Sequence, residues 1–181
     1  MKINEEQLVK KCLEKDVLAQ KQLFEYYSKR MMGVCLRYSN NTEEAQDVLQ
    51  MGFVKVFEKL EMFKQTGSLE GWIRKIIVNT ALDNIRKNKK LQNNVAIDKV
   101  DFQLGSNNET VVEALSAQDL LKVIQSMPTG FKTVFNMYVI EGYTHKEIAE
   151  ALNITESTSK SQFSRAKKYL QKILIKEETI E

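Results

Sequence analysis

SLEGWIRKIIVNTALDNIRKNKK, residues 68–90, is the stretch that decides how this chain folds. Ser68 is a good N-cap residue, Glu70 places an acid in the first turn, and no proline interrupts the segment, so a helix is predicted over 68–90. Residues that recur at helical spacing predict one buried face of this helix: Leu69, Trp72, Ile73, Ile76, Ile77 and Thr80.

A second face of the same helix is polar. It carries Lys75, Asn79, Asp83, Arg86 and Lys90, spaced by four, four, three and four residues, and Trp72 borders it. An aromatic plane beside amide, carboxylate and guanidinium groups suits nucleic acid. Residues 64–90 contain seven basic and two acidic residues, a local charge of +5, whereas the whole chain carries +3. A basic helix end can also stay solvated and merely complement the helix dipole. The choice between this interpretation and nucleic-acid binding depends on the rest of the chain.

Composition favours a globular helical protein. The 181 residues are 43% hydrophobic and 28% charged with a single proline, which is enough for one ordinary domain or two small ones. Cys12 and Cys35 lack a CxxC spacing and are predicted to be reduced, and the single His145 leaves too few ligands for a zinc site. No apolar run reaches 18 residues, and no phosphate-binding or nucleophile motif is present. We therefore expect a cytoplasmic protein with no cofactor, no bound metal, no membrane insertion and no enzymatic activity.

The N-terminal half predicts a bundle of four helices. The first covers 4–14, the second follows an Asp16 cap and runs to residue 38, and the third starts at a Thr42 cap and carries apolar residues as far as Leu60. With the helix over 68–90 they form a predicted domain over 5–90. Residues 91–113 lose the helical period and are acidic, which predicts a flexible linker; a long surface loop within one domain is the alternative.

The C-terminal half predicts a second small helical domain over 114–176. Helices are expected over 116–127 and 131–140, the second ending at Gly142. Its predicted inward residues are Phe131, Val134, Phe135, Tyr138 and Val139.

The segment from Thr144 to residue 176 shows the pattern of a helix-turn-helix. Thr144 and Glu147 form a capping box, Asn153 can adopt the left-handed turn conformation, and Thr155 caps a helix over 156–176. The outer surface of that last helix is polar and basic, as a helix that reads the major groove requires: Glu156, Ser157, Lys160, Ser161, Ser164, Arg165 and Lys168. A solvated packing or coiled-coil helix is the alternative. The fold class is accordingly all-α, with two small helical domains.

With both halves in view, the chain resembles the bacterial ECF (extracytoplasmic function) sigma factors over about residues 8–175. Four strings carry the resemblance: EAQDVLQ at 44–50 with Phe53 and Phe57, WIRKI at 72–76 with Asn79, Ala81, Leu82 and Asp83, GYT at 142–144 with Glu147, Ile148 and Ala149, and KS at 160–161 with Arg165 and Ala166. Each string is weak alone, and their order and separation make the match specific.

The resemblance implies partners and site residues. The partners are core RNA polymerase and promoter DNA, as duplex at the minus-35 element and as a single strand at the minus-10 element, and many relatives also bind an anti-sigma factor. Contact with core polymerase would involve Asp47, Val48, Leu49, Gln50 and Phe53. Capture of the minus-10 strand would involve Trp72, Lys75, Asn79, Asp83, Arg86 and Lys87. Binding to the minus-35 duplex would involve Thr144, Thr155, Glu156, Ser157, Lys160, Ser161, Ser164, Arg165 and Lys168.

Three departures from the family pattern qualify the resemblance. Met51 and Gly52 replace an acidic and apolar pair, Asn153 replaces the commoner glycine of the turn, and Ser159 takes a place that is usually apolar, so that the start of the last helix is expected to pack less firmly. Two other functions are alternatives to the sigma factor. One is a stand-alone helix-turn-helix regulator acting as a dimer; the other, an enzyme acting on nucleic acid, is remote because no metal cluster or catalytic triad pattern is present.

Overall fold

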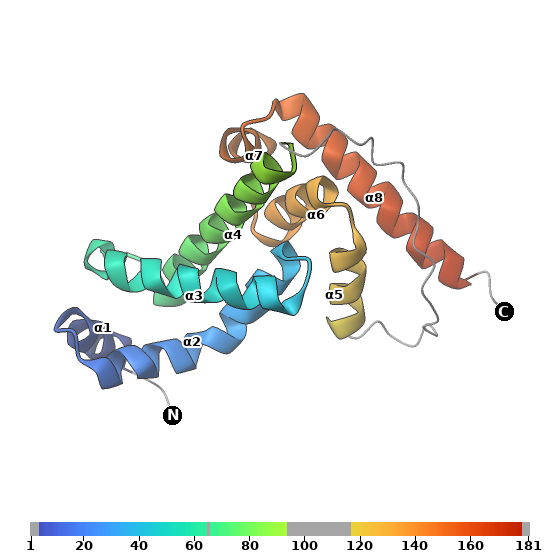
Figure 1. Cartoon of the computed structure of the whole chain (residues 1–181). Helices are drawn as coiled ribbons and strands as arrows, with labels where there is room; N and C mark the ends of the chain where they lie inside the picture. Colours follow the sequence, from blue (N-terminus) through green and yellow to red (C-terminus); the bar gives the residue numbers. More distant parts are fainter. Residues whose placement is uncertain (1–3, 65, 94–116, 179–181) are drawn as a thin grey trace. The chain divides into compact units, whose positions relative to one another are not determined.

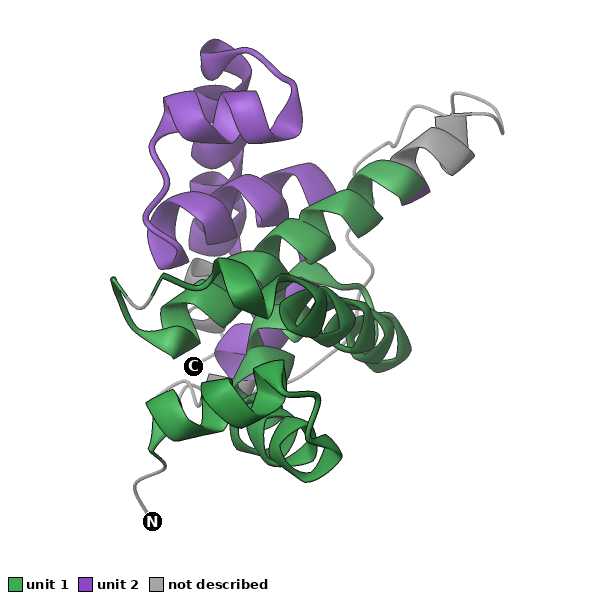
Figure 2. Cartoon of the chain, turned by 90° about the vertical axis from the view of Figure 1, so that its left-hand side faces the viewer, with its two compact units in different colours: residues 1–87 green, residues 88–181 purple. Residues whose placement is uncertain are grey.

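The computed structural model describes residues 4–64, 66–93 and 117–178, and all secondary structure within them is helical, as predicted (Figure 1). The chain divides into two compact units, Met1–Lys87 and Asn88–Glu181 (Figure 2). The predicted linker begins at residue 91, but the helix before it continues to Asn93. The rest of that linker, 94–113, lies outside the described residues.

The described residues of unit 1 form three α-helices, one 3-10 turn and most of a fourth α-helix, which ends a few residues past the unit boundary. They are α1 (Glu5–Leu13), α2 (Val17–Tyr38), α3 (Thr42–Lys59), η1 (Leu60–Met62) and α4 (Leu69–Asn93). Capping explains where the helices begin: Asp16 accepts hydrogen bonds from the backbone N–H groups of Leu18 (2.8 Å) and Ala19 (3.2 Å). The cap of α3 is one residue earlier than predicted, because Asn41 rather than Thr42 accepts from the Glu44 N–H at 2.7 Å.

The core of unit 1 lies between the apolar faces of these helices. Side chains from all four α-helices are buried there, among them Leu8, Cys12, Leu23, Tyr27, Met31, Cys35, Val56, Ile73, Ile77 and Leu82. The rings of Phe24 on α2 and Phe53 on α3 meet edge to face, with centroids 4.8 Å apart. Cys12 and Cys35 are both buried and free.

Gly52 allows α3 to approach α4 closely. A Cβ atom built on Gly52 would collide with Cδ1 of Ile77, a core residue of α4 with no exposed surface. Any larger side chain here would therefore force the end of the Ile77 side chain to move, so the glycine serves packing and not backbone conformation. This explains part of the Met51-Gly52 departure noted in the sequence, because the glycine belongs to the helix interface while Met51 remains 44% exposed.

Unit 2 contains α5 (Ala117–Ser126), α6 (Thr129–Phe135), the π-helical segment η2 (Asn136–Ile140), α7 (His145–Leu152) and α8 (Glu156–Glu178). Its small core contains Ile124, Met127 and Ala166, against which Phe131, Phe135, Ile140, Tyr169 and Leu170 pack. The Tyr169 hydroxyl donates to the Ser126 carbonyl at 2.9 Å and so ties α8 to the end of α5.

The π-helical segment corrects one prediction. Tyr138 and Val139 were expected to face inward, but they are 40% and 51% exposed, while Met137 is buried. The Glu141 N–H bonds to the Asn136 carbonyl at 3.0 Å, five residues back, so this turn is wider than an α-helical turn and the 3.6-residue register no longer holds. Gly142, with φ of 76°, ends the segment at the predicted position.

Candidate nucleic-acid interface

A groove opens beside the start of α4. Ser68 caps this helix by accepting a hydrogen bond from the Gly71 N–H at 3.1 Å, which fixes the path of the loop that precedes it. The groove has a volume of about 470 Å³, and its lining includes Met62, Phe63, Lys64, Thr66, Trp72 and Lys75. The rings of Phe63 and Trp72 are 5.4 Å apart at 49°, and Trp72 is half-buried. The groove thus offers aromatic surface and positive charge side by side.

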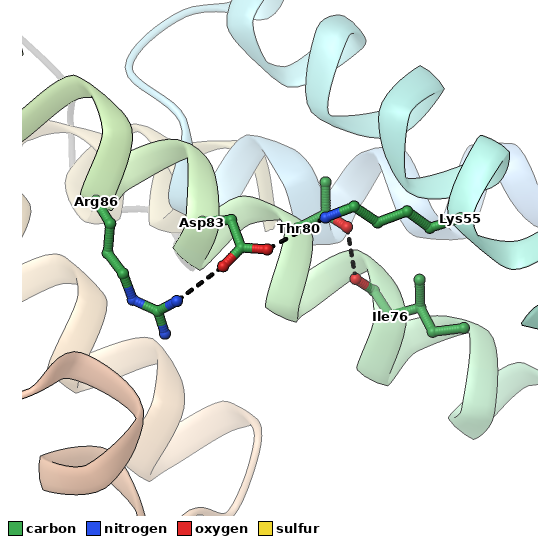
Figure 3. Close-up of polar contacts among 5 residues, drawn as sticks. All are labelled: Lys55, Ile76, Thr80, Asp83 and Arg86. Carbon is green, nitrogen blue, oxygen red and sulfur yellow. Dashed lines mark hydrogen bonds and ion pairs between the residues drawn. The ribbon is translucent and has the colours of Figure 1, made fainter.

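The polar row predicted on α4 is exposed. Its members Lys75, Asn79, Asp83 and Arg86 reach solvent, as does the neighbouring Lys87; the side chain of Lys90 lies outside the described residues. Of the residues predicted for the buried face, Leu69, Ile73, Ile77 and Thr80 are buried, and Trp72 and Ile76 are half-buried. The Thr80 hydroxyl donates to the Ile76 carbonyl at 2.9 Å, so this polar group is satisfied within the helix (Figure 3).

Asp83 links two cations on this surface. Its Oδ2 atom lies 3.1 Å from Nζ of Lys55 on α3, and its Oδ1 atom lies 2.7 Å from a guanidinium nitrogen of Arg86 (Figure 3). We call these three residues the Asp83 network. All three side chains are at least one third exposed, so the pairs add little to stability but fix where the charges lie.

Sequence reasoning missed Lys55 and most of the groove lining. Lys55 comes from another helix, 28 residues before Asp83, and no local spacing connects the two. Met62 ends η1 and Phe63 lies in the loop after it, where the helical period of α4 gives no information. An aromatic residue shortly before a capped helix with a tryptophan at its fourth residue was the one signal that could have indicated the groove.

The structure separates the residues predicted for the contact with core polymerase into two groups. Asp47 and Gln50 are exposed on the outer face of α3, which also presents Met51 and Val54, 44% and 56% exposed. In contrast, Val48, Leu49 and Phe53 are 1%, 8% and 2% exposed. These three pack in the core of unit 1 and present little surface to a partner.

The helix-turn-helix is present in unit 2 as predicted. Thr144 accepts from the Glu147 N–H at 3.2 Å, and the Glu147 carboxylate accepts from the Thr144 N–H at 2.8 Å, which completes the capping box. Asn153 adopts φ 52° and ψ 51°, the left-handed turn expected for it. Thr155 accepts from the Thr158 N–H at 3.0 Å and caps α8.

All nine residues predicted to face the minus-35 duplex are exposed: Thr144, Thr155, Glu156, Ser157, Lys160, Ser161, Ser164, Arg165 and Lys168. Two of them interact with each other, since Nζ of Lys160 lies 2.7 Å from the Glu156 carboxylate. The hydrogen bond from Lys160 lowers the pKa of Glu156. The hydroxyls of Thr144 and Thr155 are already engaged at the two helix starts, which leaves the exposed α8 side chains as the groups of this set that are not used for capping.

Comparison with known proteins places both units in one protein class. Residues 23–91 match Sigma-70 region 2, and residues 117–170 match Sigma-70 region 4. The fold and these two regions, in this order, define a sigma-70-type RNA polymerase sigma factor. Similarity to individual sigma factors identifies the group of sigma factors to which the chain belongs.

The chain is 25% identical over 158 residues to the ECF RNA polymerase sigma factor SigE of Mycolicibacterium smegmatis, covering 86% of this chain and 61% of that relative. It is 24% identical over 180 residues to the RNA polymerase sigma-H factor of Pseudomonas aeruginosa, covering 94% and 93% of the two chains. It is 28% identical over 141 residues to the RNA polymerase sigma factor SigV of Bacillus subtilis, covering 78% and 82%. The chain therefore spans less than two thirds of the mycobacterial relative and nearly all of the Pseudomonas one.

Among solved structures, the sigma factor RpoE from Bartonella quintana, crystallised with the anti-sigma factor NepR, shares the fold with a TM-score of 0.52 and 22% identity, covering 85% of this chain and 95% of that one. The chain belongs to the ECF sigma factors. The alternative of a stand-alone helix-turn-helix regulator acting as a dimer is not favoured, because the N-terminal unit matches Sigma-70 region 2.

Two further features concern membranes and metal ions. In the part of the chain that the structure describes, no helix is long and apolar enough to cross a membrane. Among the same residues, no group of three or more histidine, cysteine, aspartate or glutamate side chains could hold a metal ion.

Proposed function

We propose that this chain is a cytoplasmic initiation subunit that joins core RNA polymerase, opens promoter DNA at the minus-10 element and binds the minus-35 element as duplex. Residues 5–90 would act as region 2, 91–113 as a tether and 114–176 as region 4. The chain itself would catalyse no reaction and need no cofactor. The observation that carries the proposal is the exposed polar row on α4, which begins at the groove beside Trp72.

Opening of the minus-10 element would be driven by capture of unpaired bases. An aromatic surface such as that of Phe63 and Trp72 can stack a base, and each stacked base contributes about 1–3 kcal/mol. Asn79 supplies an amide that can hydrogen-bond a base edge, while Arg86 and Lys87 can hold phosphates. Duplex DNA offers no unstacked base to such a surface, so binding selects the separated strand.

Contact with core polymerase would use the outer face of α3. Asp47 and Gln50 provide polar groups there, and Met51 and Val54 provide apolar surface that is otherwise left in water. A mixed polar and apolar helix face is typical of a helix-packing interface between proteins. An anti-sigma factor would compete for surfaces of this kind.

Recognition of the minus-35 element would use α8. Ser157, Lys160 and Ser161 lie near its N-terminus, where side chains of a recognition helix reach base edges in the major groove. Arg165 and Lys168 lie further along, where they can pair with phosphates. Because each unit offers only a small basic surface, neither should bind a promoter tightly without polymerase, and binding should weaken as salt rises.

The test is transcription in vitro with purified core polymerase and fragmented genomic DNA. Promoter-specific transcripts should appear only when the chain is added, and permanganate should detect unpaired thymines near the start sites. The double variant Asn79→Ala with Arg86→Ala should abolish the permanganate signal. Lys21→Ala is the matched control, because it removes one positive charge from an exposed pair on α2 and should leave opening intact.

Two outcomes would count against the proposal. If no specific transcript appears with the unaltered chain, the chain is not an initiation subunit. If the double variant opens promoters as well as the Lys21→Ala control does, the face of α4 is not the melting surface. A Val54→Asp variant tests the α3 face separately: co-elution with core polymerase should be lost, and its retention would remove α3 from that interface.

A further inference from the structure

His145 and Ser159 form a contact between the two helices of the helix-turn-helix. His145 is the first residue of α7, and Ser159 lies in the first turn of α8. Nδ1 of His145 and Oγ of Ser159 are 3.0 Å apart, within hydrogen-bonding distance. Ser159 has no exposed surface. The place that is usually apolar is therefore filled by a hydroxyl with a partner, and the looser packing expected for Ser159 is not what the structure contains.

The histidine ring is itself held by aromatic neighbours. It stacks on the ring of Tyr138 from η2, with centroids 4.4 Å apart and planes at 14°. The ring of Phe163, one turn further along α8, lies 5.8 Å away at 58°. The imidazole thus bridges three segments of unit 2, and these contacts restrict its rotation.

Ser159 depends on this partner. A buried hydroxyl that loses its hydrogen bond is destabilising, because its interaction with water has already been given up. Ser159 also lies between residues that face outward: Ser157 on one side and Lys160 on the other are both exposed. Neighbouring residues in the first turn of α8 therefore provide both the buried contact to α7 and the exposed side chains proposed to face DNA.

We propose that His145, through Ser159, is a positioning residue for minus-35 recognition: the pair sets how α8 lies on α7, and thereby which bases the outer side chains reach. This inference rests on the proposed function. Contacts to base edges require placement to within about half an ångström, so a small shift of α8 alters discrimination between sequences more than it alters folding. The pair replaces an apolar contact by a directional one, which specifies one arrangement of the two helices.

The first test does not depend on the proposed function. His145 is the only histidine in the chain, so ¹⁵N spectra of the full-length protein contain one set of imidazole signals. Ser159→Ala should move the Nδ1 signal and change the ratio of the two ring tautomers. Ser161→Ala, which removes an exposed hydroxyl two residues away, is the control and should leave both unchanged. If Ser159→Ala leaves the imidazole signals where they were, the hydrogen bond is absent and the inference fails.

The second test measures discrimination at the minus-35 element. The amide of an asparagine places a polar atom near the position of Nδ1, whereas that of a glutamine places it near Nε2. His145→Asn should therefore retain the preference for the native minus-35 sequence over single-base substitutions, and His145→Gln should reduce that preference roughly fivefold, the equivalent of one lost hydrogen bond. Neither variant should change the response to minus-10 substitutions on the same promoter.

Each outcome decides one question. Absence of specific transcripts with the unaltered chain removes the proposed function, while the imidazole spectra still decide the hydrogen bond. Native discrimination by both His145→Gln and Ser159→Ala overturns the positioning role. Equal losses for His145→Asn and His145→Gln also overturn it, because they would show that the ring and not Nδ1 is required. Circular dichroism of each variant establishes that the helices are intact before discrimination is compared.

Discussion

Gly52 and Gly33 offer a direct test of the packing between α3 and α4. Both glycines lie inside helices, α3 and α2 respectively. A Cβ atom on Gly33 meets nothing within 4 Å, whereas one on Gly52 would collide with Cδ1 of the buried Ile77. Replacing each glycine by alanine therefore makes the same chemical change in open space and in a closed interface.

The expected magnitudes follow from two opposing effects. Alanine is favoured over glycine inside a helix by about 0.5–1 kcal/mol, so Gly33→Ala should raise the free energy of unfolding by that amount. Gly52→Ala has the same gain, but the forced movement of Ile77 costs about 1–3 kcal/mol. Because the helix term is common to both variants, the difference between them measures the packing cost alone.

The assay is urea unfolding followed by tryptophan fluorescence. Trp72 is the only tryptophan of the chain and belongs to unit 1, as both glycines do, so its emission reports unfolding of that unit. The two variants should differ in stability by about 1–3 kcal/mol, with Gly52→Ala the weaker. Equal stabilisation by both alanines would refute the reasoning, since it would mean that Ile77 moves aside at no cost.

Two further predictions concern stability elsewhere in the chain. Asn153→Ala should destabilise unit 2 by about 1 kcal/mol, because alanine is disfavoured in the left-handed conformation, whereas Asn153→Gly should be close to neutral; thermal unfolding followed by ellipticity compares them. Burial, aided by a hydrogen bond to Glu5, raises the pKa of Tyr27, and burial raises that of Cys35 from 9.0 to about 12. The unfolded chain therefore releases these protons at lower pH than the folded chain, so the contribution of these two groups to the stability of unit 1 should be constant below pH 9.0 and fall as pH rises beyond it. Tyr27→Phe should flatten the part of that fall above pH 10.0, and an unchanged slope would contradict the assignment.

The helices of this chain could be predicted because their signals are local. Asp16, Ser68 and Thr144 each accept hydrogen bonds from the first turn of the helix that follows, and this capping needs no information about distant residues. The inward residues of the segment over 131–140 could not be predicted in full. The wide turn at its end depends on where its hydrogen bonds close in three dimensions, and a fixed period then places Tyr138 on the wrong side.

The candidate site was predictable where one helix carries it. The spacing of Lys75, Asn79 and Asp83 places them on one face of α4, and they are exposed there. Lys55 could not be found in this way, because it meets Asp83 only when α3 packs on α4. Similarly, no sequence period indicated that Ser159 would find a polar partner across the turn.

The Asp83 network has a consequence for how the free chain behaves among bulk DNA. Its carboxylate acts as an internal counterion for Lys55 and Arg86, so a phosphate that binds these cations competes with it. Breaking such pairs takes up salt ions that offset those released from the nucleic acid, which flattens the dependence of binding on ionic strength. A sigma factor built in this way would spend less time on random genomic sequence before it meets polymerase.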